Sequence, residues 1–444
     1  MNLTQVPRAA TVNRLNRLPV TAYHRKMTWI LGFIFFFDMG DINTLSFAAP
    51  AIMKSWRLPI AVIGYLTSAT FIGMFAGSAL AGWFSDRVGR RKALILTTAW
   101  YAGFSLLNAF AWNPASLFVS RMLTGVGISA MTVVGITYIS EMYPARLRGS
   151  YQGWIMAIGL CGVPMTGYVA RFFIPMAPWG WRLVFVWGSL GMLFPLFSRA
   201  LEESPRWHEN HGRIDEADAV LDRIEARVRA ESGAALPPIS DSAAPAARKG
   251  RFIELFAPAY LPRTTMLLSA WICLTLGFFS FTSWIPTLLV AHGISLIHSL
   301  AWSSAITLAT VPGALIAGLV SDRWDRKWLL TAIALIIAFC GLMYGLASAS
   351  AMIIFSGFIV EMLLHSMTPL LYSYTAEMYP TEIRNSGTGM VYGTGRLVNV
   401  LGPFIVVFFF NHYGYTSVFV YMAGTWVLFA ATVAFFGPRS RGLA

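Results

Sequence analysis

The sequence predicts an all-α membrane protein with twelve transmembrane helices arranged as two six-helix bundles. Of the 444 residues, 56% are hydrophobic and only 12% are charged, and the mean hydropathy is +0.60. A composition this apolar is not that of a soluble globular domain. Apolar segments long enough to cross a bilayer recur between short polar loops. Two charged motifs also occur twice, which indicates that the second half of the chain repeats the first.

The repeated motifs share one spacing along the chain. The first reads GWFSDRVGRRK around Asp86 and GLVSDRWDRK around Asp322. The second reads YISEMYPARLR around Glu141 and YTAEMYPTEIR around Glu377. In both cases the second copy follows the first by 236 residues. Two different motifs with one offset indicate a duplicated architecture rather than a chance match.

The predicted membrane helices follow from the apolar segments. Each segment has about 20 residues or more, which is enough to span ~30 Å of hydrocarbon at ~1.5 Å per residue. The weakly apolar sequence near Ser348 separates two segments that otherwise nearly fuse. Small-xxx-small spacing at Gly73 with Gly77, and at Gly389 with Gly393, predicts close helix packing. The first six helices are predicted at 28–53, 60–84, 93–112, 116–140, 150–172 and 181–199, and the second six at 264–290, 295–320, 328–348, 351–376, 387–411 and 416–437.

The polar segments divide the chain further. Ala217, Val220, Leu221 and Ile224 recur at helical spacing and predict a short amphipathic helix between the bundles. An Ala, Pro and Ser-rich stretch after it is typical of a flexible linker. The predicted sections are an N-terminal tail (1–26), a first bundle (27–200), a cytoplasmic linker (201–263), a second bundle (264–437) and a C-terminal tail (438–444).

Charge placement gives the expected orientation. The net charge is +13, but most of the 33 Lys and Arg residues lie in alternate loops. This is the positive-inside pattern, so we expect both termini to be cytoplasmic, in a bacterial inner membrane, and we expect no nucleic-acid partner. The N-terminal residues have no apolar core, so we expect no cleavable signal peptide. Cys161, Cys273 and Cys340 are too far apart for a disulfide framework or a metal site, and we expect a monomer without metal or cofactor.

The charged residues of the repeated motifs predict a latch at the cytoplasmic helix ends. Two helices joined by a tight charged turn cannot move independently, and their side chains can reach neighbouring helix ends. We expect Glu141 to act with Arg148, and Glu377 with Arg384. The competing interpretation is that these arginines only anchor the topology. The predicted latch residues are Asp86, Arg87, Arg90, Glu141, Arg148, Asp322, Arg323, Arg326, Glu377 and Arg384, with Glu203 and Arg206 in the EESPR sequence that begins the linker.

Four ionisable residues at membrane depth are the predicted proton-coupling residues. Asp38 and Asp41 lie about one turn apart on the first helix, and Glu361 and His365 lie one turn apart on the tenth. A charge at this depth is costly, so such residues are usually retained for a task. Each pair has a structural alternative, because the aspartates could hydrogen-bond a neighbouring helix and Glu361 could satisfy His365.

Two deep arginines are the predicted substrate-binding residues. Arg396 has no acid within one turn of its own helix, so its charge must be met by another helix, by water or by a substrate. Arg121 has two interpretations, a structural counter-ion or a participant in coupling. Asn43 and Asn399 are the polar residues expected to complete this site.

The motifs resemble those of the major facilitator superfamily, in which the charged latch closes a cytoplasmic gate. EESPR resembles the PESPR signature of the sugar-porter branch, and Arg121 in RMLTGVG matches the arginine of the superfamily's fourth helix. FFDMGDINTLSF, WIPTLLVAHG and GRLVNVLGP look like segments of bacterial niacin transporters, which belong to the branch with synaptic-vesicle-type proteins and organic-ion carriers. Met131, where that family tends to carry a glutamate, and Glu361 with His365 depart from its pattern.

The resemblance and the deep charges together predict a proton-coupled symporter rather than an enzyme. It would import a small organic solute, such as a nicotinate-like carboxylate, by alternating access. Arg396 would attract the carboxylate, and Asp38 or Asp41 would take the proton. One alternative is a proton-driven exporter of organic cations or drugs, in which Asp38, Asp41 and Glu361 bind the substrate. Another is a non-transporting sensor that retains the fold.

Overall fold

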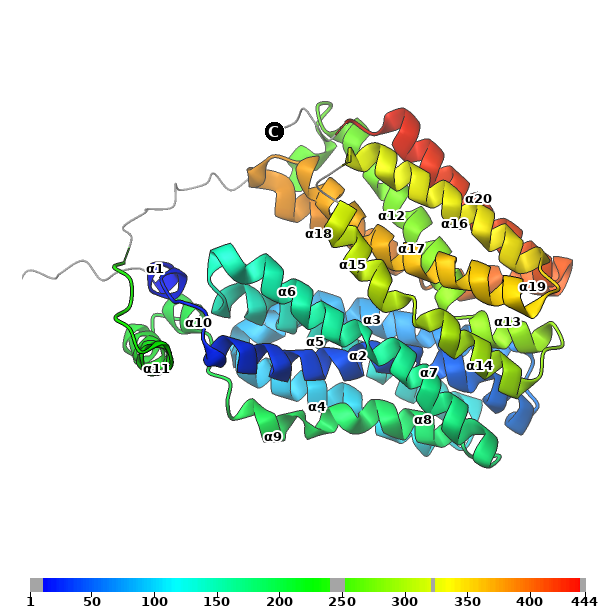
Figure 1. The fold of residues 1–444 in the computed structure, drawn as a ribbon, viewed down its shortest axis with the longest axis horizontal. Coiled ribbons are helices and arrows are strands. Elements are labelled where there is room, and N and C mark those ends of the chain that lie inside the picture. Colours follow the sequence, from blue (N-terminus) through cyan, green and yellow to red (C-terminus); the bar gives the residue numbers. More distant parts are fainter. Residues whose placement is uncertain (1–10, 240–251, 321–323, 440–444) are drawn as a thin grey trace, which may run out of the picture.

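The twelve predicted membrane helices are confirmed in the computed structural model, which describes residues 11–239, 252–320 and 324–439. Two bundles lie one above the other in Figure 1, with blue to green helices below and green to red helices above. The first half contains α2 (Ala22–Trp56), α3 (Ile60–Val88), α4 (Arg90–Ala109), α5 (Pro114–Met142), α6 (Ala145–Leu160) with α7 (Gly162–Phe173) and η1 (Ile174–Met176), and α8 (Trp181–Gly188) with η2 (Ser189–Leu193) and α9 (Phe194–Ser198). The second half contains α12 (Leu261–Thr282) with α13 (Ile285–Ala291), α14 (Leu296–Thr307) with α15 (Thr310–Val320), α16 (Arg326–Leu346), α17 (Ser350–Glu377), α18 (Thr381–Val398) with α19 (Gly402–Tyr413), and α20 (Tyr415–Phe436).

Several membrane segments are interrupted helices. The breaks before α13 and α19 are followed by Pro286 and Pro403, each of which lacks the N–H that continues a helix. Within the described residues, eleven helical segments are long and apolar enough to span a membrane. The remaining one, α4, begins with Arg90, Arg91 and Lys92, which lower its hydropathy.

The duplication is visible in individual contacts. The Tyr143 hydroxyl lies 2.9 Å from the Thr28 hydroxyl, and Tyr379 donates to Thr264 at 3.0 Å, with both residues of the second pair 236 positions after the first. Tyr138 likewise donates to a backbone carbonyl at 2.6 Å, and its counterpart Tyr374 does so at 2.8 Å. The same side chains therefore hold the same helix ends in both halves.

Glycine allows two helices of the first half to touch. A Cβ on Gly73 would lie 1.9 Å from the Met122 carbonyl oxygen, and one on Gly77 would lie 2.1 Å from the Val126 carbonyl oxygen. The predicted close packing of α3 against α5 is therefore confirmed. The matching prediction for Gly389 and Gly393 is wrong in this structure, since a Cβ on either glycine would meet no atom within 4 Å. That part of α18 faces open space.

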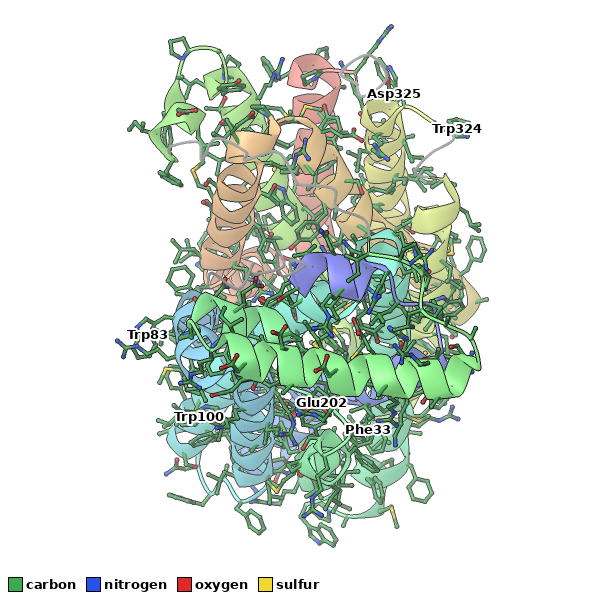
Figure 2. All side chains as sticks on the ribbon, turned by 90° about the vertical axis from the view of Figure 1, so that its left-hand side faces the viewer. Phe33, Trp83, Trp100, Glu202, Trp324 and Asp325 are labelled. Atoms are coloured by element: carbon green, nitrogen blue, oxygen red, sulfur yellow. The ribbon has the colours of Figure 1, made fainter. Side chains whose placement is uncertain are left out.

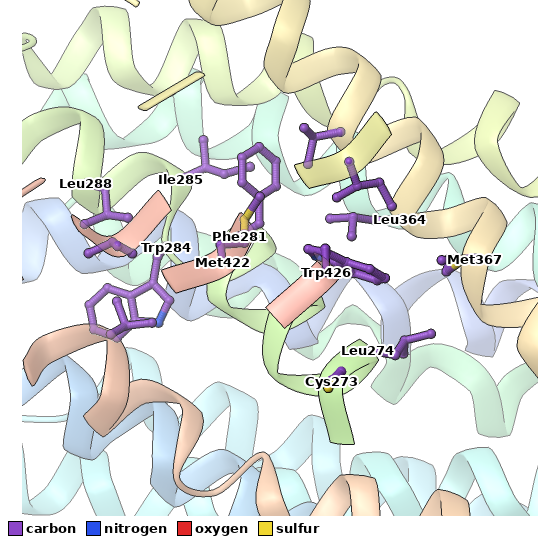
Figure 3. Close-up of a cluster of buried hydrophobic side chains, with 14 of the residues drawn as sticks. Cys273, Leu274, Phe281, Trp284, Ile285, Leu288, Leu364, Met367, Met422 and Trp426 are labelled. Carbon is purple, nitrogen blue, oxygen red and sulfur yellow. The ribbon is translucent and has the colours of Figure 1, made fainter. Parts of the chain in front are cut away.

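The first half has one apolar cluster of its own, and a larger cluster runs through the second half and continues into helices of the first. Figure 3 shows part of the larger cluster, with Trp426 and Met422 of α20 beside the labelled side chains of α12. Gly277 lies under Trp426, because a Cβ there would be 2.5 Å from the indole Nε1. Such contacts fix the rotation of α12, which also carries residues of the candidate site.

Three further helices cover the end of the first half at which the described chain begins, and we call it the terminal end (Figure 1). They are α1 (Thr11–Asn16), α10 (Pro205–Asn210) and α11 (Ile214–Ser232), and the last contains the predicted amphipathic face. Figure 2 shows α11 lying across this end. Arg14 of α1 pairs with acidic residues of α11, including Glu225 at 3.0 Å. These hydrogen bonds raise the pKa of Arg14. They lower the pKa of Glu225, although burial of that carboxylate acts in the opposite direction.

The two halves meet from the middle of the molecule to the opposite end, which we call the far end. Ser46 donates to the Ser283 carbonyl at 2.8 Å, and Ser68 donates to the Val400 carbonyl at 2.9 Å. The rings of Tyr65 and Phe404, with centroids 5.3 Å apart, form another contact between the halves. In Figure 1 the bundles converge toward α13 and α14 and diverge toward α1 and α11.

Candidate functional site

Asp41 and Arg121 form a buried ion pair inside the first half. The Arg121 Nη1 lies 3.4 Å from the Asp41 Oδ2, and the two side chains are 1% and 0% exposed. Ser105 donates to the other Asp41 oxygen, while Arg121 also donates to the hydroxyls of Thr44 and Thr70 at 3.2 Å. This network compensates both charges, as a buried pair requires. In this structure Arg121 is therefore the counter-ion of Asp41, and a part for Arg121 in coupling stays a prediction.

Asp38 is equally buried but only partly satisfied. Its Oδ2 accepts a hydrogen bond from Thr132 at 3.1 Å, and its Oδ1 has no hydrogen-bond partner among the described residues. An electrostatic interaction links it with Arg396 of the opposite half. The first helix therefore presents one neutralised acid and one available acid.

Arg396 reaches across the boundary between the halves. Its Nη1 donates to the Ser129 hydroxyl on α5, and its Nε donates to the Tyr392 hydroxyl at 2.8 Å. The guanidinium also lies over the Tyr392 ring, 4.8 Å from the centroid. Within the described part of the chain, no carboxylate forms an ion pair with Arg396. Sequence analysis missed Ser129, although Tyr392 at one turn before Arg396 could have been found.

Tyr392, the ring that contacts Arg396, packs against two further aromatic rings. Trp271 of α12 lies 4.7 Å from Tyr372 of α17 and 5.3 Å from Tyr392 of α18, measured between ring centroids. Tyr372 and Tyr392 are 5.2 Å apart. Sequence analysis gave none of them a role, because aromatic residues are frequent along the whole chain. We call these three rings and Arg396 the Arg396 aromatic cluster.

Glu361 and His365 form the polar site of the second half. Glu361 accepts a hydrogen bond from Thr310 at 3.3 Å, and His365 Nδ1 lies 3.6 Å from its Oε1. The predicted sharing of one helix face is therefore confirmed. Among the described residues, no hydrogen bond or ion pair links these two with Asp38, Asp41 or Arg396.

The two candidate asparagines lie apart from these contacts. Asn43 donates to the Met39 carbonyl of its own helix at 3.0 Å. Asn399 is buried at the break between α18 and α19, and its Oδ1 has no hydrogen-bond partner in the described structure. Neither residue contacts Arg396 in this state.

A small cavity of ≈ 20 Å³ lies where Arg121 approaches the second half. Its polar lining includes Ser46, Thr67, Thr70 and Arg121 of the first half and Ser283 of the second. This volume suits about one water molecule, and the lining offers several hydrogen-bond partners.

The latch residues form contacts within each half. Arg90 lies 3.1 Å from Glu141 and 2.5 Å from Asp86, and Arg326 pairs with Glu377. Arg90 and Arg326 occupy equivalent positions of the repeat. The predicted partners of Glu141 and Glu377 were Arg148 and Arg384. In this structure the two glutamates instead contact Arg90 and Arg326, at the starts of α4 and α16.

Arg148 and Arg384 do not pair with the predicted glutamates in this structure. The Arg148 Nε has no hydrogen-bond partner among the described residues, and Arg384 donates to the Tyr379 carbonyl at 3.4 Å. Both lie in the first turn of a helix, α6 and α18 respectively. Asp322 and Arg323 lie outside the described residues.

The remaining latch candidates have separate roles. Glu203 Oε1 accepts the Arg91 N–H at 2.8 Å, so it caps the start of α4. Burial and the nearby charge of Arg148 lower the pKa of Arg206. Arg87 lies over the Trp83 ring at 4.4 Å and takes no part in the Arg90 pairs. Figure 2 shows Trp83 at the outer side of the first half.

Two helical bundles that meet around deep charged residues define a multi-pass membrane transporter. The chain belongs to the family described as "Sugar (and other) transporter", whose sequence model matches residues 26–444. It is therefore a metabolite transporter of the sugar-porter type within the major facilitator superfamily, and not an enzyme.

Relatives and solved structures agree with this assignment. The chain is 42% identical over 438 residues to "Putative metabolite transport protein YyaJ" of Bacillus subtilis (strain 168), covering 98% of this chain and 96% of that protein. It is 28% identical over 436 residues to the niacin transporter NiaP of Acinetobacter baylyi (strain ATCC 33305 / BD413 / ADP1), covering 97% and 98%. The crystal structure of a D-xylose-proton symporter has the same fold, with a TM-score of 0.75, 18% identity and coverage of 95% and 99%.

Proposed function

We propose that this protein is a proton-coupled symporter that imports a small aromatic or other organic carboxylate. The observation that carries the proposal is Arg396, a cation at the boundary between the halves that forms no ion pair with a carboxylate in the described structure. Its planar guanidinium matches a carboxylate at two points. The rings of the Arg396 aromatic cluster offer a planar solute a surface on the same side.

Asp38 supplies the coupling. It interacts electrostatically with Arg396, and one of its oxygens has no hydrogen-bond partner among the described residues. A solute carboxylate at Arg396 brings a second negative charge near Asp38. Two neighbouring negative charges favour a proton on one of them, so solute and proton stabilise each other's binding. Asp41 does not serve this role, because Arg121 already compensates its charge.

Alternating access follows from the contacts between the halves. The loop charges favour a cytoplasmic terminal end, so the far end would face the opposite side of a bacterial inner membrane. The described contacts between the halves at Ser46 and Ser68 would then close the outer side, and the cytoplasmic side would be open. Rocking of the halves would break these contacts and bring the latch residues together. One chain contains both halves, so a monomer suffices.

An exporter of organic cations is the second candidate. It is favoured by two carboxylate oxygens, Asp38 Oδ1 and Glu361 Oε2, that have no hydrogen-bond partner among the described residues. Either oxygen could accept an ammonium N–H. Arg396 opposes this function, because its charge repels a cation at the boundary.

The test is uptake by purified protein in proteoliposomes. Nicotinate is the first solute to assay because one relative is named a niacin transporter. We expect an inward proton gradient to drive accumulation, and we expect benzoate but not organic amines to compete. Arg171→Ala, at an exposed arginine near the far end, is the matched control and should transport normally. Proton-driven movement of amines without competition by carboxylates would replace the symporter with the exporter.

A further inference from the structure

Glu361 is a buried carboxylate that the proposed mechanism does not use. Its side chain is 1% exposed. Oε1 accepts the Thr310 hydroxyl at 3.3 Å, and Oε2 has no hydrogen-bond partner in the described part of the chain. An ionised carboxylate without a cation is costly at this depth, whereas a protonated one is not. The site is therefore suited to hold a proton.

The equivalent helices of the first half carry a different polar contact. Arg121 donates to Thr70 of α3 in the first half, and Thr310 of α15 donates to Glu361 in the second, at equivalent helix crossings. Arg121 compensates the charge of Asp41. By the 236-residue spacing Arg121 corresponds to Gly357, and Glu361 lies one helical turn further along α17, at the position equivalent to Gly125.

Neighbouring helices provide no ion pair to Glu361. The helix α17 packs against α12, α14, α15, α16 and α18. His365 on its own helix and Thr310 on α15 are the polar side chains that contact Glu361 in the described structure. The charged groups of the packed helices contact other atoms, and Glu382 of α18 is exposed. No described hydrogen bond or ion pair joins Glu361 with the remaining titratable groups of these helices and of α17 itself, which are Cys273, Cys340, Tyr344, Tyr372, Tyr374 and Tyr392. The contacts of the charged groups are those of Arg263 with the Met378 carbonyl, Arg326 with Glu377, Lys327 with the Trp328 ring, Arg384 with the Tyr379 carbonyl, Arg396 with Tyr392 and Ser129, and His298 with Ser295.

His365 is the more exposed residue of the pair. Its side chain is 11% exposed, against 1% for Glu361, and its ring packs on Phe278 at 5.1 Å. Nδ1 is 3.0 Å from the Glu361 carbonyl oxygen, which can only accept, so Nδ1 carries the proton. Nε2 is then free to accept a proton, while Nδ1 lies 3.6 Å from Glu361 Oε1.

We propose that Glu361 and His365 form a second proton-binding site, loaded and emptied through His365, so that two protons accompany each solute. A proton from water binds His365 Nε2, the Nδ1–H bond breaks and Glu361 Oε1 gains that proton. After the halves have reoriented, a proton leaves His365 Nε2 and the proton on Glu361 Oε1 moves back to His365 Nδ1. These two steps restore the starting tautomer of His365. The count of two rests on the proposed function, in which Asp38 carries the first proton.

The electrical charge moved per cycle distinguishes one proton from two. A monocarboxylate imported with one proton moves no net charge. The same solute imported with two protons moves one positive charge inward. An inside-negative potential should therefore accelerate wild-type nicotinate uptake and have no effect on Glu361→Gln. Asp38→Asn is the comparison variant, because it removes the first site and should abolish accumulation.

Proton binding can also be measured without a solute. Infrared difference spectra of the detergent-purified protein during a pH titration report the C=O stretch of a protonated buried carboxyl. We expect two components of that band in the wild type. Glu361→Gln should lose one of them, Asp38→Asn should lose the other, and Glu361→Asp should keep both because it keeps the titrating group. His365→Asn should keep both components and slow uptake by about tenfold or more, because it removes the relay.

Two results would overturn the second site. One is a titrating carboxyl band that loses no component in Glu361→Gln and disappears entirely in Asp38→Asn alone. The other is equal voltage dependence of nicotinate uptake in wild type and Glu361→Gln. If nicotinate is not transported, the proposed function fails while the infrared titration still decides whether Glu361 binds a proton.

Discussion

The two halves of the molecule share their helix-end contacts and differ in their deep charges. Arg90 with Glu141 repeats as Arg326 with Glu377, and the tyrosine contacts at the helix ends repeat as well. At membrane depth the first half holds a compensated ion pair, whereas the second holds Glu361 without a cation among the described residues. The comparison shows that the repeat keeps the contacts that fix the helix ends and differs in its deep polar contacts.

The terminal end gives a second contrast. In the described structure, α1, α10 and α11 form hydrogen bonds and ion pairs with one another and with the first half, as in the bond from Trp207 to the Asp86 carbonyl at 2.6 Å. These helices would therefore move with the first half during rocking.

The largest effect is expected at Asp38. If it carries the coupled proton, Asp38→Asn should abolish gradient-driven accumulation of nicotinate. Solute exchange should partly survive, because exchange requires only that the solute-loaded protein reorients. Proteoliposome uptake and counterflow measure the two activities. Wild-type accumulation by Asp38→Asn would show that the available acid of the first half is not the coupling residue.

Asp41 should instead behave as a structural residue. Asp41→Asn leaves Arg121 buried without its counter-ion, and breaking such a pair costs about 3–5 kcal/mol. We expect a clear drop in thermal stability of the purified protein. The double variant Asp41→Asn with Arg121→Gln should recover part of that loss, and a double variant no more stable than the single one would contradict the pairing.

Arg396 tests the connection between the halves. Arg396→Lys keeps the charge but loses the planar fork, so nicotinate affinity should fall about tenfold, or ~1.4 kcal/mol. Arg396→Ala should weaken binding further. Competition binding on purified protein measures both, with Arg121→Lys as the contrast, since that change should reduce stability more than affinity. Unchanged affinity in Arg396→Ala would remove this residue from the site.

The smallest effect concerns the terminal helices. The folded-state pKa of Glu225 is lowered, so its ion pairs with Arg14 and Arg17 stabilise the docking of α11 above the unfolded pKa of about 4.3 and lose this effect as pH falls through the folded value. We expect a contribution of about 1 kcal/mol or less. Limited proteolysis near α11 should accelerate at low pH in the wild type. Arg14→Gln should be cleaved faster at neutral pH and show a weaker pH dependence.

The sequence by itself determined the twelve helices, the duplication and the depth of the charges. These features are local: an apolar segment must span the bilayer wherever it packs, and Asp38, Asp41, Glu361 and Arg396 keep their depth because they are fixed along a helix. The contact of Glu361 with His365 was predictable for the same reason, since one helical turn separates them.

Only the tertiary structure decided which charges meet. Asp41 rather than Asp38 pairs with Arg121, 80 residues away, and Arg396 reaches Ser129 across 267 residues. Such pairings depend on helix rotation and crossing, which side-chain packing between helices sets and which no local pattern encodes. For the same reason the partners of Glu141 and Glu377, and the aromatic rings around Arg396, emerged only once the helices were placed against one another.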